Sequence, residues 1–209
     1  MGNRLQNSES EHEIRIIACG AIAAEILAIK EQAGLAKISL ECLPAILHNS
    51  PDQIPQAVDD AITAAKAEGL DQIFVGYADC GTGGMLDKVC EKHGVSRLDG
   101  PHCYSFFSGN EAFSTITEEE FTSFYLTDFL ARQFEAFVIK PLGLDRHPEL
   151  RDSYFGHYEK LVYLAQVEDA ELDKKAKAAA DILNLEYEKR LTGFGDLSVE
   201  LEELHNAAT

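Results

Sequence analysis

Short apolar runs alternate with amphipathic helical patterns over the first half of the chain. The helical patterns carry apolar residues at helical spacing, whereas the apolar runs are short enough for single strands. This alternation predicts a parallel sheet with right-handed crossovers, and strands that are apolar on both faces are typical of a sheet covered by helices on both sides. The predicted strands are 14–18, 38–43, 72–78 and a weaker one from 96–98, and the predicted helices are 22–32, 52–68 and 85–92.

Beyond Glu111 the pattern changes, because aromatic residues recur along a stretch that opens with a helix-start sequence at Thr117–Glu120. Their spacing predicts a long helix to Lys140 whose aromatic side chains pack in the core. Pro141 and Gly143 end this helix. The aromatic residues concerned are Phe121, Phe124, Tyr125, Phe129, Phe134 and Phe137.

After this segment the alternation returns, with a helix at 149–158, strands at 162–166 and 185–191, and helices at 170–183 and 197–205. The predicted fold class is α/β, with an open, mostly parallel sheet flanked by helices, a helical insertion and a C-terminal strand/helix portion. We expect a disordered lead-in at 1–12 and a single α/β domain at 13–209. Its parts are a sheet half with the cysteine motifs at 13–110, a helical segment at 111–160 and a returning strand/helix half at 161–209.

The charge of the chain excludes some classes of partner. The formal net charge is −18, and nucleic acids and anionic membranes bind basic surfaces, so neither is an expected partner. No run of about 18 apolar residues suggests a membrane span, and the polar N-terminus does not resemble a secretory signal, so we expect a cytoplasmic protein. Five cysteines in a reducing compartment favour metal binding or catalysis over disulfides.

Three cysteines, Cys19, Cys80 and Cys103, fall where a strand pattern ends in a glycine or aromatic turn. In open α/β sheets, ligands bind at the carboxyl ends of the strands. The placement therefore predicts a metal site with three thiolate ligands, although each cysteine taken alone also fits a buried structural position. The other two cysteines, Cys42 in a strand pattern and Cys90 on the apolar face of a helix, are predicted to lie in the core.

The loop after Cys80 is rich in glycine. Gly81, Gly83 and Gly84 permit left-handed backbone conformations, and their N–H groups are predicted to bind an anionic group of a cofactor. The alternative is a tight turn between strand and helix. The loop lacks the Gly-Lys-Ser/Thr ending of a Walker phosphate loop.

Two histidines are candidate catalytic groups near the same sheet end. His48 follows the second predicted strand, where it would act as a fourth ligand or an acid/base group, or else lie on the surface. His102 precedes Cys103, and neighbouring residues of a strand point to opposite faces. We therefore expect His102 to contact the substrate or to support a ligand rather than to bind the metal with Cys103.

Arg146 and His147 belong to a charged segment between two helical patterns, Asp145–Arg151. One interpretation is that this segment closes over the sheet end and that Arg146 or His147 binds an anionic substrate. The other is a structural cluster in which Arg146 pairs with Asp145 or Glu149.

Several motifs resemble the uncharacterised family called "domain of unknown function 1638". They are ACGA at 18–21, LHNSP at 47–51, YADCGTGG at 77–84, HCY at 102–104, FYLTDFLARQF at 124–134, LGLDRHPELRDSYFGHY at 142–158 and VYLAQ at 162–166. The resemblance implies a soluble prokaryotic protein with one α/β unit. It also implies a link to one-carbon metabolism, since such proteins are often encoded among genes for corrinoid-dependent methyltransferases. No reaction is assigned to the family.

The leading hypothesis is a zinc site at Cys19, Cys80 and Cys103 that holds a substrate nucleophile deprotonated for methyl transfer, as in a metal-dependent methyltransferase or lyase. The expected partners are a small-molecule substrate and a corrinoid protein or methyltransferase. A [4Fe–4S] cluster on the same three cysteines is the alternative cofactor. Two other classes stay open: a non-catalytic accessory protein of a corrinoid methyltransferase system, and a metal-free thiol enzyme with Cys80 as nucleophile and His102 or His48 as base.

Overall fold

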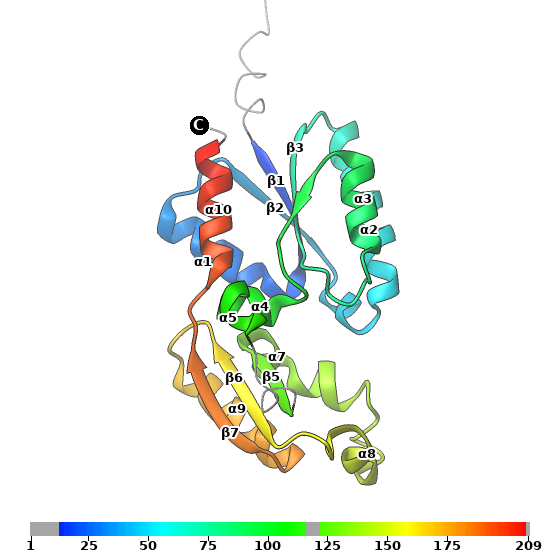
Figure 1. Cartoon of the computed structure of the whole chain (residues 1–209), viewed down its shortest axis with the longest axis vertical. Helices are drawn as coiled ribbons and strands as arrows, with labels where there is room; N and C mark the ends of the chain where they lie inside the picture. Colours follow the sequence, from blue (N-terminus) through cyan, green and yellow to red (C-terminus); the bar gives the residue numbers. More distant parts are fainter. Residues whose placement is uncertain (1–12, 116–121, 208–209) are drawn as a thin grey trace, which may run out of the picture. The chain divides into compact units, whose positions relative to one another are not determined.

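The computed structural model describes residues 13–115 and 122–207. The chain divides into two units. The first contains the chain up to Cys103 together with the segment from Asp196 onward, and the second contains Tyr104–Gly195. Each unit is built on a parallel sheet with helices beside it, which confirms the predicted α/β fold class (Figure 1).

The sheet of the first unit has the strand order β2-β1-β3-β4. Its strands are β1 (Ile14–Cys19), β2 (Ile38–Leu43), β3 (Gln72–Gly76) and β4 (Ser96–Arg97). Helices α1 (Ala23–Ala33) and α10 (Asp196–Ala207) cover one face, and α2 (Ile54–Ala67) and α3 (Met85–His93) cover the other (Figure 1). Short 3-10 helices η2 (Gly20–Ile22), η3 (Ala45–Asn49) and η4 (Pro51–Gln53) connect strands to helices.

The centre of this sheet is fully buried, as the apolar sequence of β1 predicts. Ile16, Ile17 and Ala18 each have no exposed surface, because helices cover both faces of the strand. Ile17 packs towards α2 and α3, together with Val75 of β3. The parallel registers of β1 with β2 and β3 bring the carboxyl ends of these strands to one edge of the sheet.

The sheet of the second unit has the order β5-β6-β7. The strands are β5 (Ser123–Thr127), β6 (Lys160–Ala165) and β7 (Glu186–Leu191). Helices α7 (Asp128–Phe134) and α9 (Ala170–Leu183) pack on one face. Between α7 and β6 the chain forms the short helices η5 (Glu135–Ile139), η6 (Pro148–Leu150) and α8 (Arg151–Phe155). Two aromatic residues from α4 (Cys103–Ser108) and α5 (Asn110–Ser114) pack on the other face against Tyr125.

The predicted long helix to Lys140 is wrong for its central part, because Ser123–Thr127 forms β5 and pairs with β6. Phe124 and Tyr125 consequently point to opposite faces of a strand: Phe124 packs against Phe155, and Tyr125 stacks on Tyr104. Helical structure begins only at Asp128, where the Thr127 hydroxyl accepts a hydrogen bond from the N–H of Leu130. The predicted helix start at Thr117–Glu120 and Phe121 lie outside the described residues, as does the expected lead-in at 1–12.

A buried carboxylate that the sequence pattern does not single out joins β5 to β6. Asp128 is 1% exposed, and one of its oxygens accepts hydrogen bonds from the Tyr163 hydroxyl at 2.6 Å and the Gln166 N–H at 3.2 Å. The N–H of Asp128 in turn donates to the Gln166 side chain at 2.7 Å. Burial raises the pKa of Asp128 in spite of these hydrogen bonds. The network fixes the start of α7 against the end of β6.

No helix within residues 13–115 and 122–207 is long and apolar enough to cross a membrane.

The pairing of β1 with β3 depends on a glycine. Ala18 and Gly76 are partners in this pair, and a Cβ atom at position 76 would lie 2.7 Å from the Ala18 Cβ and 3.2 Å from the Ile16 Cγ2. Gly76→Ala should therefore lower the free energy of unfolding by about 1–3 kcal/mol, measured by urea denaturation.

A double-mutant cycle tests the cause. In an Ala18→Gly background the closest contact is gone, so Gly76→Ala should cost clearly less than it does in the wild type. An equal loss in the two backgrounds would show that the clash with Ala18 is not the reason.

Candidate functional site

Thiols gather at the carboxyl edge of the first unit's sheet. Cys19 is the last residue of β1, and Cys80 lies in the loop between β3 and α3. Both side chains pack against the core between the sheet and helices α2 and α3, next to Tyr77. Cys19 and Cys80, two of the three cysteines predicted to meet at one sheet edge, therefore lie near each other.

Cys19 begins a short helix. Its Sγ accepts a hydrogen bond from the Ala21 N–H at 3.4 Å, as the N-cap of η2. Burial raises the pKa of the Cys19 thiol, and this effect outweighs the opposing effect of the Ala21 N–H. The helix start is therefore present, as the sequence indicates, but it does not make Cys19 a thiolate by itself.

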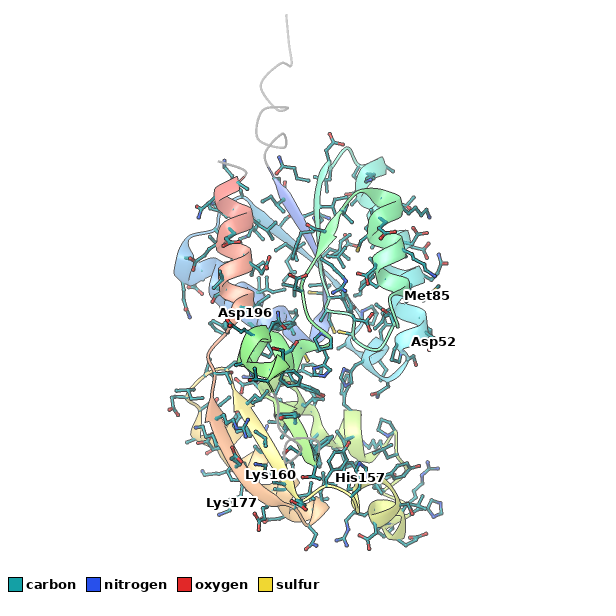
Figure 2. The ribbon with its side chains drawn as sticks, viewed as in Figure 1. Asp52, Met85, His157, Lys160, Lys177 and Asp196 are labelled. Atoms are coloured by element: carbon teal, nitrogen blue, oxygen red, sulfur yellow. The ribbon has the colours of Figure 1, made fainter. Side chains whose placement is uncertain are left out.

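Cys80 lies in a loop that folds around the carboxylate of Asp79. This carboxylate accepts hydrogen bonds from the Thr82 hydroxyl at 2.8 Å, from the Gly84 N–H at 2.9 Å and from the Gly83 N–H at 3.2 Å. Burial opposes the ionisation of Asp79, but these hydrogen bonds prevail and lower its pKa. The loop ends where α3 begins at Met85, which is labelled in Figure 2.

The predicted anion site on Gly81, Gly83 and Gly84 has a partner within the chain. All three glycines have positive φ, as the sequence suggests, but the N–H groups of Gly83 and Gly84 already bind the carboxylate of Asp79. Gly81 lies close to Pro51, whose Cγ would be 3.5 Å from an added Cβ. A cofactor-binding role of these glycines stays a prediction.

Cys80 itself has a left-handed backbone with φ 50°, which is uncommon for a residue with a side chain. The loop backbone is held from the other side as well, because the Cys80 N–H donates to the carbonyl of Pro101 at 2.8 Å. Burial, and after it the charge of Cys19, raise the pKa of Cys80 to about 12. Both thiols are therefore protonated at neutral pH unless a cation binds them.

The hydroxyl of Tyr77 points into this group of thiols. Tyr77 is 2% exposed, and among the described residues its hydroxyl has no oxygen or nitrogen partner for a hydrogen bond. The group beside it is the Cys19 thiol, a weak acceptor, and Cys80 and Cys42 are near enough to affect it electrostatically. Burial and these thiols raise the pKa of Tyr77. The apolar run at 72–78 predicts a strand and gives no sign of a chemical role for Tyr77.

We expected Cys103 to lie at the end of a strand. In the structure it is the first residue of α4. It is partly exposed and follows Pro101, the residue that accepts the Cys80 hydrogen bond, by two positions. Burial lowers the pKa of the neighbouring His102. Within residues 13–115 and 122–207, no three side chains of His, Cys, Asp or Glu converge closely enough to hold one metal ion.

Cys42 was predicted to lie in the core, and this is wrong. The strand prediction was right, but β2 is an edge strand, and the Cys42 side chain is exposed near its end. Cys42 is paired with Ala18, the residue before Cys19. Cys90, in contrast, is buried on α3 as predicted.

The remaining candidates are exposed. His48 lies on η3 in the first unit. In the second unit, Arg146 Nε is 3.7 Å from Asp145 Oδ1, and His147 Nδ1 is 3.2 Å from Glu149 Oε1. Catalytic roles of His48, His102, Arg146 and His147 stay predictions.

The variant Arg146→Ala tests whether the segment Asp145–Arg151 is a structural cluster. The Arg146 side chain is 73% exposed and its contact with Asp145 is long, so Arg146→Ala should change the free energy of unfolding by less than about 0.5 kcal/mol. Arg97→Ala is the control, since Arg97 is mostly buried and donates to Asp87 and to the Leu98 carbonyl, each at 2.6 Å. A larger loss for Arg146 than for Arg97 in urea denaturation would support the structural cluster.

Tyr77→Phe removes the buried hydroxyl beside Cys19. Because this hydroxyl has only a thiol beside it, the free energy of unfolding should change by less than about 0.5 kcal/mol. The pKa of Cys19, followed by thiolate absorbance, should rise, because the hydroxyl lowers it in the wild type.

Tyr163→Phe is the matched control for stability. The Tyr163 hydroxyl donates to the buried Asp128 carboxylate, so its removal should cost about 1–3 kcal/mol. Equal losses in the two variants would mean that the Tyr77 hydroxyl makes a full hydrogen bond.

Comparison with known proteins identifies a family and no reaction. The family described as "Protein of unknown function (DUF1638)" matches residues 42–199. The match includes Cys42, Cys80 and Cys103 and begins after Cys19. No curated protein and no solved structure matches the chain. Since the match covers more than half of the chain, the protein belongs to the DUF1638 family of unknown function.

Proposed function

We propose that the first unit binds a thiophilic metal ion, with zinc as the favoured ion, through Cys19, Cys80 and Cys103. The observation that supports this most is the proximity of two partly buried thiols, Cys19 and Cys80, at the carboxyl edge of a parallel sheet. Thiolates are the ligands that zinc and iron–sulfur clusters prefer. Cys103 lies two residues after Pro101, whose carbonyl accepts a hydrogen bond from the Cys80 N–H, and this connection makes Cys103 our candidate for the third ligand.

The protonation of the thiols favours metal binding over a metal-free thiol enzyme. With a pKa of about 12, only about one Cys80 in 10⁵ is ionised at pH 7, which is too few for an efficient nucleophile. A divalent cation reverses this, because its charge stabilises the thiolates against burial and mutual repulsion. The three cysteines supply the kind of ligand atom that a thiophilic metal ion prefers. Their side chains would move closer together when the metal binds.

Neighbouring residues would support such a site. Asp79 fixes the loop that carries Cys80, and the Tyr77 hydroxyl is placed to donate a hydrogen bond to a Cys19 thiolate. The charge of Arg97 lowers the pKa of Cys80, so it partly offsets the negative charge of the thiolate. Hydrogen bonds and charges of this kind commonly orient metal ligands.

The chemistry that we propose is activation of a substrate nucleophile for methyl transfer in one-carbon metabolism. A zinc ion with three thiolates and an open position lowers the pKa of a bound thiol or water. The site would take a small-molecule substrate, and a corrinoid protein or methyltransferase would be the partner. A [4Fe–4S] cluster on the same cysteines and a non-catalytic accessory role are the alternatives that the following measurements separate.

Zinc binding should depend on all three cysteines. We expect Cys19→Ser, Cys80→Ser and Cys103→Ser each to weaken zinc binding by at least about 100-fold, measured by chelator competition on protein purified without oxygen. Cys90→Ala is the control: it should keep the metal and lose only about 1–2 kcal/mol of stability, because Cys90 is buried on α3. Full metal retention in all three serine variants would refute the site, and broad visible absorbance with bound iron would favour the cluster.

Zinc binding should also release protons. Because the thiols are protonated in the free protein, three ligands should release about three protons at pH 7, measured by calorimetry in buffers of different ionisation enthalpy. The apparent affinity should therefore fall steeply as the pH is lowered. A release of about two protons that does not change in Cys103→Ser would exclude Cys103 as a ligand.

A further inference from the structure

We propose that a groove between α2 and α3 is a docking surface for an acidic, amphipathic helix of a partner protein. The groove has a volume of about 260 Å³, and residues of these two helices alone line it. It lies entirely within the first unit. The inference goes beyond the proposed metal site and does not depend on it.

One wall of the groove is a single face of α3. The residues that line this wall are Met85, Lys88, Val89 and Lys92. They follow each other at intervals of three and four positions, so their side chains lie on the same side of the helix. Met85 is 49% exposed and Val89 is partly exposed. Single exposed apolar residues are common on protein surfaces, but these two share a hollow with two lysines.

The opposite wall is the first part of α2, and polar contacts tie the two helices together at this groove. The Asp59 Oδ1 of α2 lies 2.7 Å from the Lys92 Nζ and 2.5 Å from the His93 Nε2. Farther along α2, the Lys66 ammonium group donates a hydrogen bond to the His93 carbonyl at 2.6 Å. Because these contacts fix the helices to each other, the groove exists before a partner binds, which lowers the cost of binding.

The charge of the groove favours an acidic partner. Lys88 is exposed, and within the described parts of the chain its ammonium group contacts the Met85 sulfur at 3.7 Å and no carboxylate. Lys92 is 61% exposed although it pairs with Asp59, and its partner carboxylate is also bound by His93. The groove therefore presents basic side chains on a chain whose net charge is −18. Such a local basic patch attracts carboxylates and selects against basic partners.

An apolar strip bordered by lysines suits a helix that lies in a groove. Apolar side chains on one face of the partner helix would cover Met85 and Val89. Glutamates at the border of that face would reach Lys88 and Lys92. Because α3 begins at Met85, where the loop that carries Cys80 ends, the bound helix would lie beside this loop.

The experiment measures binding of a labelled synthetic peptide to the full chain by fluorescence anisotropy. The peptide has about 15 residues, with leucine along one helical face and glutamate beside it. Lys88→Glu should raise the Kd by at least about fivefold, because it replaces an attraction by a repulsion, and Lys88→Gln should raise it less. Met85→Ser should raise the Kd by at least about threefold, because it removes apolar contact area. Both positions are exposed, so circular dichroism should show normally folded variants.

Lys177→Glu is the matched control. It changes the net charge of the chain by the same amount, at an exposed position of α9 in the second unit (Figure 2). Since the groove does not include this position, the Kd should change by less than about twofold at physiological ionic strength.

Four results would overturn the inference. The wild type could fail to bind the peptide at about 200 μM, an affinity too weak for a specific partner. Lys177→Glu could weaken binding as much as Lys88→Glu, which would mean that only the overall charge matters. A peptide with lysine in place of glutamate could bind equally well, which would remove the preference for acidic partners. Sedimentation could show a wild-type dimer that Lys88→Glu dissociates, in which case a second copy of the chain occupies the groove.

Discussion

The parallel pairing of β1 with β3 is the constraint on which the candidate site depends. The strands can approach at Ala18 and Gly76 only because position 76 has no Cβ atom. This register ends both strands at the same edge, where Cys19 is the last residue of β1 and Cys80 lies a few residues beyond the end of β3. Two thiols that are far apart in the sequence therefore meet between the sheet and its helices.

The loop beyond β3 contains a backbone conformation that is unfavourable in free energy, and hydrogen bonds within the loop offset this cost. A left-handed residue with a side chain costs about 1–2 kcal/mol, and Cys80 adopts this conformation with φ 50°. The carboxylate of Asp79 offsets it by accepting three hydrogen bonds from the same loop. Strain of this kind persists where the surroundings over-determine the backbone, and it is commonest at functional sites. The hydrogen bonds to Asp79 thus hold the loop that carries Cys80 in one conformation.

The predicted bounds of helices and strands are most accurate where the local sequence pattern and the tertiary structure favour the same element. Strand 38–43 and helix 170–183 have the predicted bounds, because apolar spacing and end signals coincide there. The helix predicted around Phe124 and Tyr125 was wrong, because the spacing of these aromatic residues fits a helix and a strand equally well. Pairing with β6 makes this segment a strand. The prediction that Cys42 lies in the core was wrong for a related reason. The strand order makes β2 an edge strand, and the apolar pattern of the sequence does not reveal this order. Tyr77 was missed because only the meeting of β1 with the loop gives its hydroxyl a chemical environment.

The balance of charge around the thiols decides what chemistry this edge of the sheet favours. An enzyme that uses a free thiolate lowers the pKa of its cysteine with a nearby cation or an exposed helix start. Here the helix start reaches Cys19 through the Ala21 N–H and Arg97 acts on Cys80, yet burial outweighs both. The second thiol makes ionisation of the first still harder, since two buried anions repel each other. A cation bound between them would offset both effects together, and the accompanying loss of protons would make metal binding depend on pH. These effects are the reason why we propose metal binding rather than nucleophilic catalysis for the two thiols.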